Sequence, residues 1–373
     1  MSADRLTRRA ALIGAGAILT PLAPNILVGA PSTSPGKTSL IKLDGNENPY
    51  GPSPAARRAI LASVGEAPRY ADATIETLTN QLAAHEGVAT SQIVIGAGSG
   101  ELLKIAGLLA VTTTSGAEVV ASRPTYEELP VFAQTLGLRV HWVPPDSEHR
   151  HDLSAMRGAI TQLTRLIYVC NPNNPTGTAV TRDALETFIR SVPVSCTVIV
   201  DEAYMDLVDQ PGVATVAGLV NDIPNVVVLR TFSKLHGLAG LRIGYAITPA
   251  ALAQRLAALS LTWPNTAGLL AAIASFNDHA FLKTTRAALT GDRAKVHATL
   301  DRMGLDRADA QGNFVFFDTG GPLKQFQDRM LAEGIKVGRH FDGYDTWARV
   351  TIGLHQEVER FLGALPRVLG ALR

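Results

Sequence analysis

Short apolar runs alternate with helix-like segments over residues 61–247. The runs are only a few residues long and rich in valine and isoleucine, which is typical of strands buried on both faces. The stretches between them have helical spacing of apolar residues, as at 101–110, 126–136 and 182–191. This alternation predicts βαβ units and a mostly parallel sheet with both faces covered. The predicted strands are residues 93–95, 118–121, 140–143, 166–170, 197–200, 226–229 and 243–247.

The pattern changes after Pro249. A helical region with few breakers is expected over about residues 266–303, and a mixed tail with strand-like runs at 313–318, 335–337 and 349–352 follows it. A chain of 373 residues is too long for one compact core, so we expect a large α/β domain and a smaller α+β C-terminal domain. The expected divisions are a signal peptide at 1–30, an N-terminal arm at 31–60, a large domain at 61–265, and an interdomain helix with the small domain at 266–373.

A glycine-rich segment, T-F-S-K-L-H-G-L-A-G-L-R-I-G-Y, follows the predicted strand at 226–229. Ligands of open α/β sheets bind at the carboxyl ends of strands, so Lys234 in this segment is expected at such a site. Its small and apolar neighbours remove water from the amine, which lowers the pKa and favours the nucleophilic form. The hydroxyls of Thr231 and Ser233 and the guanidinium of Arg242 are suited to hold a phosphate.

Two further strand ends carry polar residues. Asp201 ends the strand at 197–200, where a carboxylate can pair with a protonated pyridine nitrogen or cap the next helix. Tyr204 follows three residues later and can donate a hydrogen bond to a phenolic oxygen. Asn174 lies in the string N-P-N-N-P-T-G after the strand at 166–170; such a turn can aim one amide into a site or be a plain turn.

A small-residue turn, G-A-G-S-G at residues 96–100, lies between a predicted strand and a predicted helix. Free backbone N–H groups at a helix start make a phosphate cradle, here at Ala97, Gly98 and Ser99. The turn also resembles a dinucleotide fingerprint imperfectly, which keeps a nicotinamide-dependent dehydrogenase as an alternative. That alternative lacks an obvious ribose-binding acid after the next strand and leaves the Lys234 segment unexplained.

Taken together, these strings resemble the fold-type I aminotransferases of class I and II, which depend on pyridoxal phosphate, and among them the histidinol-phosphate aminotransferase group. The resemblance spans about residues 43–353. It implies that Lys234 holds the cofactor as a Schiff base and that Asp201 pairs with the ring nitrogen. It also implies an amino donor and a 2-oxo acid as substrates, and a homodimer with shared active sites.

The resemblance implies roles for other residues as well. Tyr204 and Asn174 would contact the ring oxygen, and Tyr126 would stack on the ring. The segment with Asn48 and Tyr50 would cover the substrate, whose acidic group Arg349 would hold. The implied phosphate contacts come from Ala97, Gly98, Ser99, Thr231, Ser233 and Arg242, with Tyr70 reaching the phosphate of the partner subunit.

One departure from the family bears on the substrate. Relatives that bind phosphorylated substrates usually carry an arginine directly after the valine that corresponds to Val337, whereas this chain has Gly338 there and Arg339 one place later. Because strand neighbours point to opposite faces, Arg339 is not expected to reach the site. The donor and acceptor stay open. A decarboxylase of the threonine-phosphate type stays an alternative, since the bond that breaks depends on its orientation to the ring.

The composition gives no sign of a nucleic-acid partner, because the formal net charge is only +1. The catalytic set looks complete, which disfavours a non-catalytic regulator that merely holds the cofactor. Cys170 and Cys196 lie in apolar runs and are interpreted as buried free thiols. His149 and His151 suggest a metal site weakly; a solvated loop is the favoured interpretation.

The N-terminus has the layout of an export signal. The basic string R-L-T-R-R at residues 5–9 precedes an apolar stretch that reaches about residue 30. Adjacent arginines in that setting resemble a twin-arginine (Tat) signal, so we expect export to the periplasm. Pro21 and Pro24 make the stretch a poor permanent membrane span. An ordinary N-terminal helix with a basic flank is the other interpretation.

Overall fold

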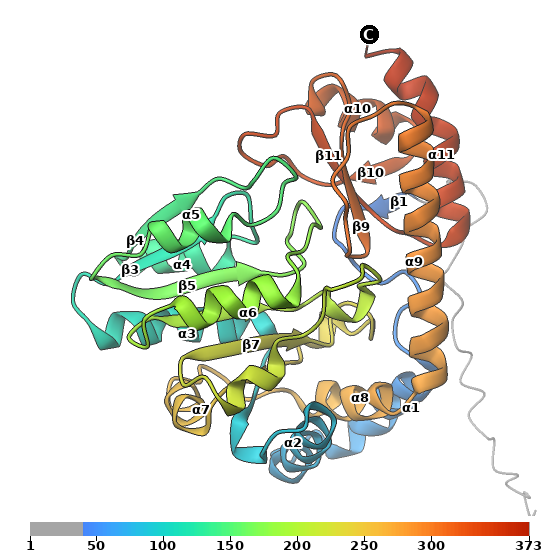
Figure 1. Ribbon diagram of the computed structural model, residues 1–373. Helices are drawn as coiled ribbons and strands as arrows, with labels where there is room; N and C mark the ends of the chain where they lie inside the picture. Colours follow the sequence, from blue (N-terminus) through green and yellow to red (C-terminus); the bar gives the residue numbers. More distant parts are fainter. Residues whose placement is uncertain (1–39, 373) are drawn as a thin grey trace, which may run out of the picture. The chain divides into compact units, whose positions relative to one another are not determined.

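A seven-stranded sheet lies at the centre of the computed structural model, which describes residues 40–372 (Figure 1). The strand order is β2-β8-β7-β6-β5-β3-β4, and all strands are parallel except β8, which is antiparallel to both neighbours. Each of the predicted strands is found in this sheet, which confirms the mostly parallel α/β architecture. The strands are β2 (Ile93–Gly96), β3 (Glu118–Ser122), β4 (Arg139–Val143), β5 (Thr164–Cys170), β6 (Thr197–Asp201), β7 (Val226–Thr231) and β8 (Gly244–Ile247).

Helices cover both faces of this sheet (Figure 1). Alternate residues of one strand enter different cores: Val198 and Val200 of β6 pack with α2, α6 and α8, whereas Ile199 packs with α3, α4 and α7. This two-sided burial explains why the strands are continuous apolar runs. The helices of this part are α1 (Pro54–Ala62), α2 (Asp72–Glu86), α3 (Ser99–Thr113), α4 (Glu128–Thr135), α5 (Leu153–Gly158), α6 (Arg182–Ser191), α7 (Ala250–Ala257) and α8 (Thr266–Phe276).

A separate core is built mainly from the C-terminal part, drawn in orange and red, together with the first strand in blue (Figure 1). Strand β1 pairs in parallel with β10, and β9 pairs antiparallel with β11. Ile41 and Leu43 belong to this core, so the start of the expected N-terminal arm packs with the C-terminal elements. The elements are β1 (Ile41–Leu43), α9 (His279–Arg302), β9 (Phe314–Asp318), α10 (Leu323–Ala332), β10 (Ile335–Val337), β11 (Trp347–Thr351) and α11 (His355–Gly370).

The helical region expected at 266–303 consists of two helices, α8 and α9. Asp278 separates them, and its side chain accepts the N–H of Phe281 as the N-cap of α9. Leu269 and Ala272 of α8 are buried in the core of the large sheet. The expected domain boundary at residue 265 therefore separates α8 from the large sheet against which it packs. Helical periodicity in the sequence does not show which hydrophobic core a helix joins.

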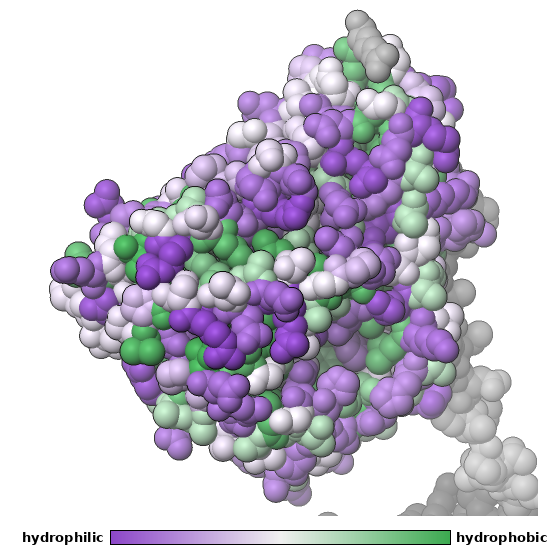
Figure 2. Space-filling model, viewed as in Figure 1, coloured by the Kyte–Doolittle hydropathy of each residue, from purple (hydrophilic) through white to green (hydrophobic). Residues whose placement is uncertain are grey.

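Several smaller expectations concern burial and exposure. Cys170 and Cys196 are buried free thiols, as expected. None of the helices within residues 40–372 is long and apolar enough to cross a membrane. On the face seen in Figure 2, hydrophilic residues predominate and apolar residues form small groups between them. The expected signal peptide at 1–30 lies outside the described residues.

Candidate functional site

The carboxyl ends of β5, β6 and β7 border a cavity of about 290 Å³. Its walls also include Arg339, Arg349 and the segment after β1, so the large sheet and the C-terminal core both contribute. Most of the residues expected to bind cofactor or substrate meet here. They are Ser99, Tyr126, Asn174, Asp201, Tyr204, Thr231, Ser233, Lys234, Arg242 and Arg349.

Lys234 directs its amine into this cavity just after β7. Its Nζ donates to the backbone carbonyl of Asn46 at 3.0 Å and lies 5.3 Å from the ring centroid of Tyr204. Burial, reinforced by the positive charge of Arg349, lowers the pKa of Lys234 to about 8, against the opposing effect of the Asp201 carboxylate. A useful fraction of the amine is therefore neutral near neutral pH, which a nucleophile or a proton acceptor requires.

Asp201 is buried at the end of β6 and is held on both oxygens. Tyr168 donates its hydroxyl to Oδ2 at 3.1 Å, and the N–H of Ala203 reaches Oδ1 at 3.1 Å. Burial raises the pKa of Asp201 to about 6, while these hydrogen bonds and the Lys234 charge oppose the rise. The carboxylate is thus still mostly ionised at pH 7 and can hold a cationic ring nitrogen. The hydrogen bond from the Ala203 N–H spans only two residues, so the Asp201 side chain also stabilises the turn that follows β6.

The hydroxyl of Tyr204 accepts hydrogen bonds from two side-chain amides. Asn46 Nδ2 lies 3.1 Å from it and Asn174 Nδ2 lies 3.4 Å from it. Arg349 Nη1 donates to Oδ1 of Asn174 at 2.7 Å, and its Nη2 donates to the carbonyl of Asp44 at 2.7 Å. The Nε of Arg349 is buried without a partner among the described residues, which leaves a donor for an anion.

The other end of the cavity suits a phosphate. Thr231 donates to the Ser233 hydroxyl at 2.9 Å, and the guanidinium of Arg242 lies close to Gly98 at the start of α3. The φ of Gly98 is +82°, which favours glycine, and a Cβ there would lie 2.3 Å from Arg242 Nη2, so a larger residue would displace that guanidinium. Two hydroxyls, a guanidinium and a helix start form a site for a dianion.

Four residues that were expected to bind cofactor or substrate do not line the cavity: Asn48, Tyr50, Tyr70 and Ala97. The N–H of Ala97 donates to Oε2 of Glu101 at 2.6 Å, so it is already engaged. Asn48 donates its amide to the carbonyl of Leu235 at 2.7 Å. Tyr50 packs against the C-terminal core. Tyr70 is 89% exposed and lies beside Trp263, with ring centroids 6.3 Å apart.

Sequence reasoning missed some residues that line the cavity and one that supports it from behind. From the segment after β1, Gly45 and Asn46 line the cavity, whereas Asn48 and Tyr50 do not. Tyr168, which orients Asp201, lies inside an apolar run of β5 and gave no separate signal. The positive φ of Asn46, 52°, is the kind of conformation that asparagine tolerates, but the sequence alone did not distinguish it from Asn48.

Two expectations about other side chains are wrong. Arg339 lines the cavity, although strand alternation placed it away from the site. The reason is that β10 ends at Val337, so alternation no longer applies two residues later. His151 is buried rather than solvated, with Nε2 2.8 Å from the carbonyl of Cys170. Over residues 40–372 no cluster of metal-ligating side chains is found.

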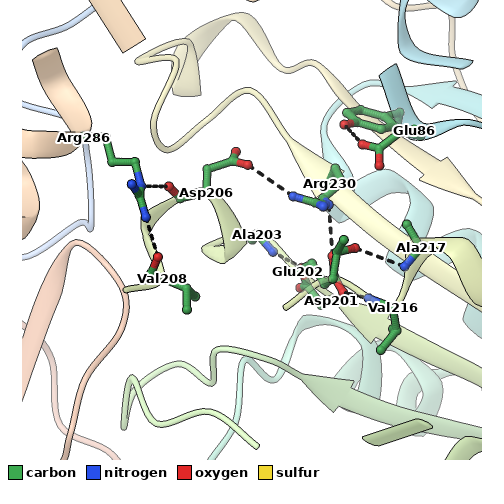
Figure 3. A network of polar contacts seen from close by, with 12 residues as sticks. Glu86, Asp201, Glu202, Ala203, Asp206, Val208, Val216, Ala217, Arg230 and Arg286 are labelled. Carbon is green, nitrogen blue, oxygen red and sulfur yellow. Dashed lines mark hydrogen bonds and ion pairs between the residues drawn. The ribbon is translucent and has the colours of Figure 1, made fainter. Parts of the chain in front are cut away.

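An ionic network around the buried Glu202 and Arg230 lies next to Asp201 at the end of β6 (Figure 3). The carboxylate of Glu202 lies 3.0 Å from Nε of Arg230, and it accepts the N–H of Val216 and the hydroxyl of Thr215. Arg230 also reaches Asp206, whose backbone carbonyl accepts a hydrogen bond from Arg286 of α9. The network ties the ends of β6 and β7 to each other and to α9.

Replacing Glu202 with glutamine is expected to destabilise the protein by about 3 kcal/mol, because it removes the buried counter-charge of Arg230 and leaves only the more exposed Asp206 to pair with it. Urea unfolding of both proteins measures the difference. Glu186→Gln is the matched control, since Glu186 pairs with Arg190 on the surface of α6 and such pairs contribute less than about 1 kcal/mol. Equal losses in the two variants would contradict a structural role for the network.

Comparison with known proteins gives consistent matches over this whole region. The family described as "Aminotransferase class I and II" matches residues 38–365. A histidinol-phosphate aminotransferase of Moorella thermoacetica is 37% identical over 90% of this chain and 86% of its own length. An aromatic amino acid aminotransferase of Rhodococcus jostii is 38% identical over 92% of this chain and 95% of its own.

A solved structure extends the match to the fold. The histidinol-phosphate aminotransferase of Sinorhizobium meliloti, in complex with pyridoxal-5'-phosphate, superposes with a TM-score of 0.82 at 28% identity. The match covers 90% of this chain and 92% of that one.

Proposed function

Because the chain belongs to the class I and II aminotransferases and is a pyridoxal-phosphate-dependent transaminase, we propose that the cavity around Lys234 is its active site. The donor would be an amino acid or an amino phosphate whose acidic group binds Arg349, and a 2-oxo acid would accept the amino group. The observation that carries this proposal is that the buried Lys234 amine, the Asp201 carboxylate and the guanidiniums of Arg242 and Arg349 line one cavity.

The donor groups of the cavity fit the cofactor. Arg242, the hydroxyls of Thr231 and Ser233, and the start of α3 would hold its phosphate. Asp201 would hold the ring nitrogen, while Tyr204 and Asn174 present polar atoms for the ring oxygen. When bound, pyridoxal phosphate supplies an electron sink for the electron pair released at the α-carbon of the substrate.

Three residues of the protein would supply proton transfer, a fixed negative charge and substrate binding. Lys234 supplies an amine that is partly neutral near pH 7, so its Nζ can accept a proton and return it. Asp201, fixed by Tyr168 and Ala203, supplies a negative charge that does not have to reorient. Arg349, buried and held by Asn174 and the carbonyl of Asp44, fixes the acidic group of the substrate and thereby its orientation.

A panel of single donors tests this function. The purified protein loaded with cofactor should absorb at roughly 410–430 nm, as expected of the lysine-bound form. A true donor should bleach that band, and a 2-oxo acid should restore it. Release of carbon dioxide, with a band that persists or recovers without any 2-oxo acid, would instead identify a decarboxylase. A protein that takes up no cofactor would overturn the proposal.

We also propose that the enzyme is a homodimer and is exported. Tyr70 is 89% exposed and its neighbour Trp263 is 65% exposed, as suits residues that contact a second subunit. The twin-arginine string at residues 5–9 supports export to the periplasm by the Tat route. Sedimentation at micromolar concentration and the location of a full-length fusion in cells test the two points; a monomer, or retention in the cytoplasm, would contradict them.

A further inference from the structure

Tyr126, which is expected to stack on the cofactor ring, has its hydroxyl tied to an acidic side chain that the proposed reaction does not use. The hydroxyl donates to Oε2 of Glu128 at 2.5 Å, and Tyr126 lines the cavity together with Asp201 and Lys234. Tyr126 is 37% exposed, so packing holds its ring only in part. A ring of this kind depends on the polar contact at its free end for a fixed orientation.

The backbone that carries Tyr126 is held independently of its ring. Thr125 donates its hydroxyl to Oδ1 of Asn173 at 2.9 Å, and Nδ2 of Asn173 donates to the carbonyl of Pro124 at 3.1 Å. These buried contacts fix the position of the main chain but not the rotation of the Tyr126 side chain. Over residues 40–372 the Tyr126 hydroxyl has no hydrogen-bond partner other than Glu128, so this contact is the one that fixes the outer end of the ring.

Gly100 at the start of α3 leaves open the space that the Glu128 carboxylate occupies. A Cβ on Gly100 would lie 2.9 Å from Oε2 and 3.0 Å from Oε1 of Glu128. Gly107, two turns further along the same face, likewise brings α3 within 3.2 Å of a ring of α4. Lys104 lies between the two glycines, and its Nζ is 3.2 Å from Oε1 of Glu128. The carboxylate is thus held by α3 on one oxygen and by Tyr126 on the other.

The electrostatics favour a lasting hydrogen bond between these two side chains. Burial, and then the hydrogen bond to Glu128 and its negative charge, raise the pKa of the Tyr126 hydroxyl. The hydroxyl therefore stays protonated and remains a donor, which makes it unsuited to the part of a general base. Burial is the main cause of the raised pKa of Asp201, and the charge of Glu128 adds to it, so Glu128 also lies near the end of the cavity where the ring nitrogen would bind.

We infer that Glu128 is a positioning residue that holds the ring of Tyr126 against the face of the cofactor, in the space that Gly100 leaves open. This inference rests on the proposed function and adds a residue to it. Glu128 is not among the residues that line the cavity, so it acts through Tyr126. Its loss should change how tightly the cofactor ring is held, while the amine of Lys234 remains in place.

Titration of the full-length, cofactor-free protein with pyridoxine 5'-phosphate tests the inference without turnover. This analogue has the ring and the phosphate but no aldehyde, so it does not bond to Lys234 and reports the contacts around the ring. Glu128→Ala should raise its Kd roughly 3- to 10-fold, the scale of one aromatic stacking contact. Glu128→Gln keeps an oxygen that accepts the hydroxyl and should stay within about twofold. Glu127→Ala is the matched control, because Glu127 pairs with Arg123 instead, and it should leave the Kd unchanged.

A double-mutant cycle separates positioning from a general loss of packing. Tyr126→Phe removes only the hydroxyl, so it should raise the Kd of the analogue about as much as Glu128→Ala does. The double variant should bind no more weakly than either single variant, because both changes break the same hydrogen bond. In the cofactor-loaded protein, both single variants should reduce the visible circular dichroism of the bound ring, and Glu128→Gln should retain it.

Gly100→Ala tests the space that the carboxylate needs. The added methyl group should displace the Glu128 carboxylate and raise the Kd, but it should have no further effect when Glu128 is already alanine. Urea unfolding should show no loss of stability, since alanine is more favourable than glycine in a helix. Gly291→Ala in α9 is the control, because a Cβ there meets nothing within 4 Å, and it should leave binding unchanged.

Three results would overturn the inference. They are an unchanged Kd in Glu128→Ala, losses in Tyr126→Phe and Glu128→Ala that add in the double variant, and a loss in Gly100→Ala that is the same with and without Glu128. All three leave the proposed function intact, because that function fails only when the wild-type protein takes up no pyridoxal phosphate or transfers no amino group.

Discussion

Replacing Lys234 with alanine is expected to abolish turnover, with a loss of more than roughly 10³-fold in kcat, and to remove the absorbance of the lysine-bound cofactor. The loss is large because Nζ has two tasks, to bind the cofactor covalently and to move the proton. Among residues 40–372, the other cations that line the cavity are arginines, which stay protonated, so this part of the chain supplies no second amine there. Steady-state kinetics and the visible spectrum of the variant measure both effects.

Lys283→Ala is the matched control for this prediction, because Lys283 is an exposed lysine of α9. It should keep the spectrum and the activity of the wild type. Added methylamine should restore part of the proton transfer to Lys234→Ala if the missing amine is the cause. Undiminished transamination by Lys234→Ala would show that the reaction does not depend on this residue.

The second large effect is expected for Asp201→Asn, which should lower kcat by about 10²- to 10³-fold, the scale for losing one preorganised electrostatic partner. The amide keeps the shape of the side chain but removes the negative charge that would hold the ring nitrogen in its cationic form. Cofactor binding should survive in part, because the phosphate contacts at Arg242, Thr231 and Ser233 remain. Kinetics and spectral titration with cofactor separate the two effects.

Asp222→Asn, on the exposed turn after residues 217–221, is the control and should leave kcat unchanged. Tyr168→Phe removes only the hydroxyl that donates to Asp201, so it should cost much less than Asp201→Asn itself. Unaltered kcat in Asp201→Asn would mean that the carboxylate serves the turn after β6 and not the cofactor.

The strands could be predicted because each is an apolar run buried on both faces. In β6, Val198, Ile199 and Val200 enter two different cores, so no polar residue interrupts the run. The polar residues that end such runs mark the carboxyl edge of the sheet. Asp201 at the end of β6, Asn174 after β5 and Lys234 after β7 could for this reason be assigned to one site from their order alone.

The parts that could not be predicted depend on contacts between distant segments. Arg339 reaches the cavity because Gly338 packs against the backbone of Arg349, a contact that strand alternation does not contain. Asn46 enters the site because β1 pairs with β10, which are almost 300 residues apart. Tyr168 looked like any other core residue until the structure placed its hydroxyl at 3.1 Å from Asp201.

The central claim is that Lys234 carries pyridoxal phosphate. Borohydride reduction of the cofactor-loaded protein fixes a lysine-bound cofactor permanently, and mass spectrometry of the digested protein then locates it. The account predicts a pyridoxyl group on the peptide that contains Lys234 and on no other lysine. A pyridoxyl group on a different lysine, or none on a protein that still transfers amino groups, would contradict the assignment of the active site.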